Sequence, residues 1–252
     1  MSFYKQYRFK PKWYFVLATI CLCTLFIYLG FWQLDRAAEK QYLQTIFTER
    51  LQQKPISLTS LPKDTDIRYL PVTITGHYDN AHSILLDNKI HAHRVGYEVL
   101  TPFSLQAECH KSHKSAICDD GQIVLVNRGW IPAGNDRHIL PAIPEIKNEQ
   151  TITGYIYLAP GKSFTLGHPI EEKINWPLRV QTLDTQLITK ELNYSLYPFI
   201  VLLSANDNSG FVRDWQPIAG SPDKHRGYAV QWFAFTFVLI IIFFSLTVRK
   251  TK

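Results

Sequence analysis

Two long apolar runs dominate the pattern of hydrophobic and polar positions along this chain. They cover residues 13–31 and 228–248. Each holds about twenty residues without a charge, which at 1.5 Å per helical residue spans the ~30 Å hydrocarbon core of a bilayer. The pattern predicts two transmembrane helices, over residues 13–31 and 225–248.

The first run has a second interpretation, as a cleaved signal peptide, because four basic residues precede it. A cleavage site needs small residues, whereas this run ends in the bulky pair Phe31-Trp32. We therefore expect the first run to be retained as an anchor.

The helical pattern continues beyond the membrane surface. Residues 32–53 contain no Gly or Pro and are rich in good helix formers. Apolar residues at Leu43, Ile46, Phe47 and Leu51 recur at helical spacing, which predicts one apolar face for docking against a folded domain.

The central segment then alternates with period two, which is typical of half-buried β-strands. We predict strands at 69–78, 82–87, 96–103, 122–130, 151–159 and 198–204, and one short helix at 184–196. The fold class is thus a membrane protein of mixed α+β type: two transmembrane helices flank an antiparallel β-rich domain, a small barrel or a sandwich. The expected boundaries are 1–12 for a tail, 13–31 for the first span, 32–54 for the helical extension, 55–224 for the β-rich domain, 225–248 for the second span and 249–252 for a second tail.

Positive charge is concentrated in the two tails. The tails carry seven basic and no acidic residues, whereas the stretch 37–224 has 18 basic and 20 acidic residues. The formal charge of +6 is therefore a topology signal and argues against a nucleic-acid surface. The positive-inside rule puts both tails in the cytoplasm and the central domain on the other side. The short first tail favours the bacterial inner membrane, with a periplasmic domain, over the mitochondrial inner membrane.

The four cysteines divide in the same way. Cys21 and Cys23 lie inside the first span, whereas Cys109 and Cys118 flank a polar loop of the extracytoplasmic domain. In an oxidising compartment this second pair favours a disulfide. His110 and His113 leave a Cys/His metal site as the alternative.

Catalytic signatures are missing from the sequence. It contains no GxSxG, HExxH or CxxC motif, and its single acids and histidines form no recognisable triad. We expect a protein that is not an enzyme.

Polar and aromatic residues gather where the two spans meet the outer membrane surface. Trp32 and Arg36 share a face of the first helix, and His225, Tyr228 and Trp232 share a face of the second. Because the helices run in opposite directions, both groups fall at the same depth.

Interfacial anchoring explains such residues. A pocket for haem explains them as well, since imidazole ligates iron, arginine pairs with propionates and aromatic rings pack the macrocycle. Interfacial anchoring and a haem pocket are both consistent with these residue types.

Three motifs in this order resemble the surfeit locus protein 1 family of assembly factors for haem-copper cytochrome oxidases. They are GFWQLDRAAEK at 30–40, VLVNRGWIP at 124–132 and HRGYAVQWF at 225–233. The family residues matched are Trp32, Gln33, Arg36, Arg128, Gly129, Trp130, His225, Tyr228, Gln231 and Trp232. The candidate cofactor-binding residues among them are His225, Arg36, Trp32, Gln33, Tyr228, Gln231 and Trp232.

The resemblance implies a role in maturing cytochrome c oxidase subunit I, around insertion of haem a, with His225 as the leading iron ligand. It implies subunit I as partner and haem a synthase as a further candidate partner. The alternative within the family is a scaffold that stabilises subunit I intermediates without a cofactor. For Arg128-Gly129-Trp130 we favour a structural role, in which Gly129 permits a bulge and Trp130 packs, over a contact with the oxidase.

Overall fold

A computed structural model of the chain describes residues 7–9, 11–62, 64–106, 109–112, 115–118, 122–134, 136, 139–158, 175–192, 194–216 and 220–250. The chain divides into two units. The helix pair comprises residues 1–46 and 216–252, and the β-domain comprises residues 47–215. Each unit is described by itself.

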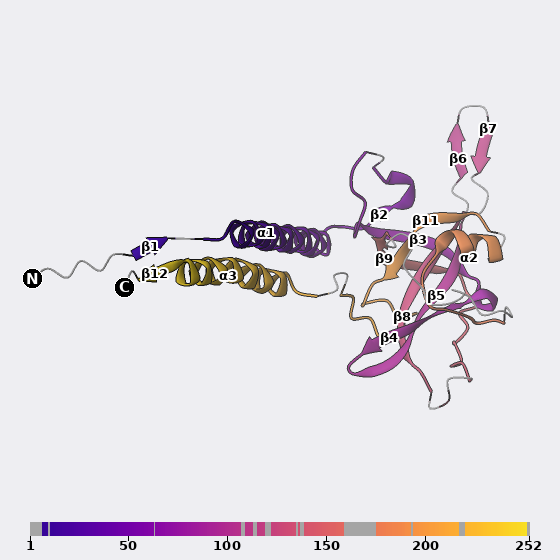
Figure 1. The fold of residues 1–252 in the computed structure, drawn as a ribbon. Helices are drawn as coiled ribbons and strands as arrows, with labels where there is room; N and C mark the ends of the chain where they lie inside the picture. The colour runs from indigo at the N-terminus through magenta and orange to yellow at the C-terminus, as the bar shows by residue number, and fades with distance from the viewer. Residues whose placement is uncertain are drawn as a thin grey trace, which may run out of the picture. The chain divides into compact units, whose positions relative to one another are not determined.

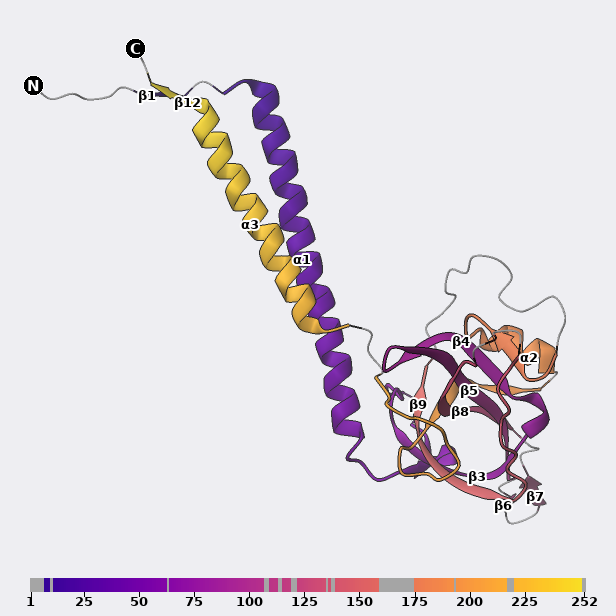
Figure 2. The same cartoon turned by 90° about the horizontal axis from the view of Figure 1, so that it is seen from below.

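The helix pair consists of two long antiparallel helices, α1 (Trp13–Arg50) and α3 (Pro222–Thr247), which lie side by side (Figures 1 and 2). Ser221 caps α3 by accepting a hydrogen bond from the Asp223 amide, and Pro222 occupies the first helical position. Beyond the far ends of the helices, the short strands β1 (Tyr7–Phe9) and β12 (Val248–Lys250) pair antiparallel.

The seam between the helices follows a heptad spacing, with the least exposed positions alternately three and four residues apart. Small residues at the seam let the backbones approach closely: a Cβ added at Gly30 would lie only 2.5 Å from the ring of Phe233. The seam positions are Thr19, Cys23, Phe26, Gly30, Gln33 and Ala37 on α1, with His225, Ala229, Trp232 and Thr236 on α3.

The outward faces of both helices are apolar and exposed, as at Leu17, Ile20, Val230 and Phe237. Both helices are long and apolar enough to cross a bilayer. Such a continuous apolar surface requires lipid rather than water as its solvent, so the chain is a membrane protein.

The β-domain is built on a closed barrel of five strands, in the order β3-β5-β8-β11-β9 and back to β3 (Figure 1). The strands that lie in the sheet are β2 (Ile56–Ser57), β3 (Pro71–Tyr78), β4 (Ile84–His91), β5 (Arg94–Leu105), β8 (Ile123–Pro132), β9 (Gln150–Tyr157), β10 (Leu178–Val180) and β11 (Leu196–Leu203). Strands β3 and β5 close the barrel at Gly76, where a Cβ would lie 2.0 Å from the Ser104 carbonyl oxygen. Only glycine permits this approach.

Period-two alternation fills the barrel interior with side chains from every strand, among them Val72, Phe103, Val124, Ile152 and Val201. A second apolar cluster lies under the short helix α2 (Thr185–Leu192). Leu125, Ile200 and Ile188 belong to this cluster, so β8 and β11 are buried on both faces.

The two long predicted helices, the six predicted strands and the barrel alternative are confirmed, with ends shifted by a few residues. The short helix predicted at 184–196 is α2, which ends at Leu192, and Leu196 begins β11 instead. The sheet is not purely antiparallel. Strands β8 and β11 pair in parallel, as do β4 with β10 and β2 with β3. The parallel pair β8–β11 is physically reasonable because β9, β10 and α2 lie between its strands in sequence and supply the long crossover that parallel pairing needs.

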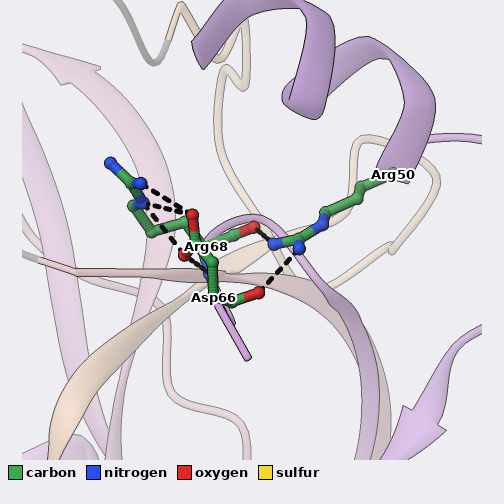
Figure 3. Close-up of polar contacts among 3 residues, drawn as sticks. All are labelled: Arg50, Asp66 and Arg68. Carbon is green, nitrogen blue, oxygen red and sulfur yellow. Dashed lines mark hydrogen bonds and ion pairs between the residues drawn. The ribbon is translucent and has the colours of Figure 1, made fainter. Parts of the chain in front are cut away.

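The last turn of α1 is held inside the β-domain (Figure 3). The Arg50 guanidinium donates hydrogen bonds to the backbone carbonyls of Asp66 and Arg68, and the Phe47 ring packs edge-on against Tyr69. The Asp66 carboxylate accepts hydrogen bonds from two side-chain nitrogens of Arg68, and this hydrogen bonding lowers the pKa of the Asp66 carboxyl group. Phe47 thus packs against the β-domain as expected, whereas Leu51 is exposed. The hydrogen bonds from Arg50 to the two backbone carbonyls were not predicted.

Candidate functional site

A hydrogen bond between the two membrane helices joins His225 to Gln33. Imidazole Nδ1 of His225 lies 2.6 Å from side-chain Oε1 of Gln33, across the seam. Residues 26 and 232 are also in ring contact, which shows the same antiparallel register along the helices. Gln33 and His225 therefore lie at one depth, as hairpin geometry requires.

This contact determines the chemistry of the imidazole. An amide oxygen only accepts hydrogen bonds, so Nδ1 of His225 carries the proton and donates it to Gln33. In the neutral ring, the lone pair is then on Nε2, which has no partner among the residues that the structure describes. Nε2 is available as a ligand, because a hydrogen bond to the other ring nitrogen orients the imidazole.

Trp32 and Arg36 flank Gln33 on α1. The Arg36 guanidinium lies over the Trp32 ring, 5.9 Å from its centroid, so the two side chains share a face as the spacing predicts. Arg36 also pairs with Glu39 at 2.7 Å, with half of its side chain exposed. An exposed pair of this kind exchanges readily, which leaves the cation available to an external anion.

The residues of the third motif divide between the seam and the outer surface of α3. Trp232 lies at the seam against Phe26 and Phe235. Tyr228 is 51% exposed and Gln231 is exposed, and neither makes a recorded hydrogen bond or ring contact with His225 within the described part of the chain. The structure thus joins Gln33 to His225 at the seam, places Trp232 at the seam two helical turns from His225, and leaves Tyr228 and Gln231 on the outer surface.

Phe26 and Gly30, which shape the seam beside these residues, were not predicted from the sequence. Phe26 is seven residues before Gln33, and Gly30 is seven before Ala37. Heptad spacing along the apolar run is the signal that identifies both.

The donor set at this depth fits haem. An imidazole with a free Nε2, an exposed guanidinium and several aromatic faces supply an iron ligand, a partner for carboxylates and packing for a flat apolar ring. His225 is the candidate ligand, Arg36 the candidate partner of an anionic edge, and Trp32 and Trp232 the candidate packing surfaces.

The motif Asn127–Trp130 lies in the β-domain and forms a bulge in β8. Along the pair of β5 with β8, Val99 is opposite Gly129 and Leu100 is opposite Asn127, so Arg128 is the extra residue. Gly129 has φ +115°, a region that L side chains rarely adopt, and its amide donates to the Asn127 side chain. The bulge expected at Gly129 is therefore present.

The bulge buries Arg128, whose exposed fraction is only 2%. Its guanidinium lies between the rings of Tyr78 and Phe211 and donates to the carbonyls of Ser209 and Pro144. Burial lowers the pKa of Arg128 and raises the pKa of Tyr78 to about 12. Arg128 thus joins β8 to two distant segments of the β-domain.

Gly129 and Trp130 hold the segment that follows β11. Trp130 exchanges two backbone hydrogen bonds with Val212, at 2.7 and 3.2 Å. A Cβ at Gly129 would lie 2.6 Å from the Val212 carbonyl oxygen, which explains why this position needs glycine. These contacts support the structural role favoured for the motif.

Cys109 and Cys118 face each other in backbone register in the ribbon of β6 (Cys109–Ser112) and β7 (Ser115–Cys118). Of the two histidines behind the metal alternative, His110 lies in β6 and His113 lies outside the described residues. Directly opposed antiparallel residues have Cα atoms about 4.5–5.5 Å apart, within the range that a disulfide spans. We expect these two cysteines to form a disulfide. In protein alkylated without reductant, peptide mass spectra should then show both cysteines unalkylated and their peptides joined, two hydrogens lighter than the two free thiol peptides together. Full alkylation of both thiols would contradict the disulfide.

Comparison with known proteins agrees with the motifs. The SURF1 family model matches residues 20–237. A SURF1-like protein of Rickettsia bellii is 24% identical over 233 residues, covering 90% of this chain and 88% of the relative. One from Rickettsia prowazekii is 26% identical over 237 residues, covering 91% and 87%. Surfeit locus protein 1 of Xenopus tropicalis is 22% identical over 261 residues, covering 95% and 76%. Because the family model spans most of the sequence, from within α1 through the strands of the barrel to the middle of α3, this chain belongs to the SURF1 family.

Proposed function

We propose that this chain is a membrane-anchored assembly factor for cytochrome c oxidase that holds haem a at the seam of its helix pair during maturation of subunit I. The SURF1 family is known generally as a family of oxidase assembly factors. The proposed setting is the bacterial inner membrane, with both tails cytoplasmic and the β-domain periplasmic. The bacterial relatives and the basic tails support this setting.

The observation that carries the proposal is the hydrogen bond between Gln33 and His225. A histidine that only anchored a helix at the interface would gain by turning its polar edge to water. His225 is instead half-buried at the seam, with one nitrogen fixed and the other left with its lone pair. This is the arrangement found around histidines that ligate metals.

Each residue of the site has a separate part in holding the group. Haem supplies the iron that the imidazole ligates. Gln33 fixes the tautomer and orientation of His225. Arg36 would pair with a carboxylate of the group, and Trp32 and Trp232 would supply aromatic packing surface. Such a site at the membrane interface suits a flat apolar ligand with an anionic edge.

The second candidate function is a scaffold that binds subunit I without a cofactor. The observation that favours it is the barrel, whose closed sheet and double-sided core form a compact unit of the chain. Haem a synthase is a candidate partner under either function.

Purification of the full chain from cells that make haem a separates the two. If the chain holds haem a, it carries a Soret band, and His225→Ala removes that band while the chain remains folded. If it is a scaffold alone, the purified protein is colourless and subunit I co-purifies equally well with the wild type and with His225→Ala.

Replacing Gln33 tests the orientation of His225. Gln33→Leu removes the hydrogen-bond acceptor, so we expect the affinity for haem a to fall about 10–100-fold, as for other partners of metal-ligating histidines. Gln33→Glu keeps an acceptor and should retain most of the affinity. Gln41→Leu is the matched control, because Gln41 is an exposed glutamine of the same helix outside the three motifs. Absorbance titration of the detergent-solubilised protein measures all three, and equal affinities for Gln33→Leu and Gln41→Leu would contradict the assigned role.

A further inference from the structure

The hairpin between β4 and β5 exposes two aliphatic side chains at its tip. Ile90 is 72% exposed and Val95 is 43% exposed. They are register partners, so their side chains lie on the same face of the ribbon. Large aliphatic residues with this exposure, side by side at the end of a projecting hairpin, form a small apolar contact surface.

The same tip is basic. Between Asn88 and Gly96 the sequence contains Lys89, His91, His93 and Arg94 and no acidic residue. Lys89 pairs with Glu98 at 3.1 Å, whereas Arg94 is exposed and makes no ion pair with any residue in the described part of the chain. The tip therefore presents an apolar pair next to an unneutralised cation.

The fold holds this tip in a fixed shape. The Trp130 indole donates to the Lys89 carbonyl at 3.0 Å, its ring lies 5.3 Å from the His91 ring, and the Ala133 amide donates to the Val95 carbonyl. At the turn, Ala92 and His93 have φ +46° and +61°, a left-handed conformation that costs non-glycine residues free energy. Trp130, which follows the bulge in β8, thus holds the hairpin tip that exposes Ile90 and Val95.

We propose that the tip of the β4–β5 hairpin, Lys89–Val95, docks onto a bilayer surface that contains anionic lipid. Aliphatic side chains that enter the acyl boundary beside a cation that meets phosphate are the components of an interfacial anchor. The β-domain is joined through the chain to two membrane helices, so a weak anchor is enough to hold it against the surface. A stable protein–protein interface needs about 800 Å² from each partner, more than two aliphatic residues provide.

Photo-cross-linking in the full chain tests this docking. A benzophenone amino acid replaces Ile90 in protein reconstituted into vesicles of phosphatidylcholine and phosphatidylglycerol. The matched control places it at His77, whose side chain is 60% exposed and which pairs with Ser104 near the opposite end of β5. We expect phospholipid adducts at position 90 and only background at 77. Adducts to a second copy of the chain, no adducts, or equal lipid adducts at both positions would overturn the proposal.

Arg94→Glu tests the charge component in the same vesicles. Reversing one charge at the surface should lower the lipid-adduct yield at position 90 by about tenfold when phosphatidylglycerol is present. In vesicles of phosphatidylcholine alone, the yield should not change. An unaltered yield with the anionic lipid would rule out the electrostatic contact, and the lipid adducts themselves do not depend on haem.

Discussion

Gly129→Ala is expected to destabilise the β-domain by about 3 kcal/mol. At φ +115° a side chain strains the backbone, and the new Cβ would lie 2.6 Å from the Val212 carbonyl oxygen. The backbone hydrogen bonds between Trp130 and Val212 must then lengthen or break. For a domain of this size the apparent Tm should fall by about 10 °C.

Thermal unfolding followed by tryptophan fluorescence in detergent measures this effect. Gly134→Ala is the matched control, because the nearest atom to its new Cβ is 3.9 Å away and its φ is not positive. It should leave the apparent Tm nearly unchanged. If both variants melt together with the wild type, the bulge does not carry the structural role assigned to it.

His225→Ala is expected to abolish stable binding of haem a. The substitution removes the only imidazole that the described part of the helix pair places at the seam, and Gln33 then has no ring to orient. Arg36, Trp32 and Trp232 keep their contacts with neighbours on their own and the facing helix, so the loss reports ligation rather than unfolding.

The measurement is the haem a content of the purified variant, with the apparent Tm as a test of folding. His77→Ala is the control, since it removes an exposed imidazole of the β-domain. Haem content should fall to background for His225→Ala and stay at the wild-type value for His77→Ala. Retention of haem by His225→Ala would exclude this residue as the ligand.

Periodicity is why much of the architecture is predictable from the sequence. The apolar runs that became α1 and α3 are long and uncharged, and the alternation of β3 appears in the order Val72, Thr73, Ile74. Local patterns of this kind are visible in the sequence without knowledge of the fold. Short elements do not: β2 and β10 contain two and three residues, too few for a period to show.

Long-range pairing and buried polar groups could not be predicted. The closure of the barrel between β3 and β5 depends on tertiary contact, although Gly76 marks where it happens. Arg128 is of a residue type that is usually exposed, and only the bulge explains its burial. Arg50 likewise gave no signal, because its partners are backbone carbonyls sixteen and eighteen residues away.

The site was predicted at the level of residue types and depth, but not of contacts. Family resemblance named Gln33, and hairpin geometry put His225 level with Arg36. The direct hydrogen bond depends on the register between two helices, which their sequences do not specify one residue at a time. Helical spacing alone did not indicate that Tyr228 and Gln231 are exposed.

Ligation of haem by His225 is tested most directly by removing the imidazole from the side chain and supplying it in solution. His225→Gly leaves room for a free imidazole next to Gln33. After mixing with haem a and removal of unbound haem by gel filtration, this variant should therefore lack the Soret band of bound haem and regain it when imidazole is present throughout. Gln33→Leu in the same background should weaken that rescue. A Soret band that is the same in His225→Gly and the wild type, with no response to imidazole, would contradict the account.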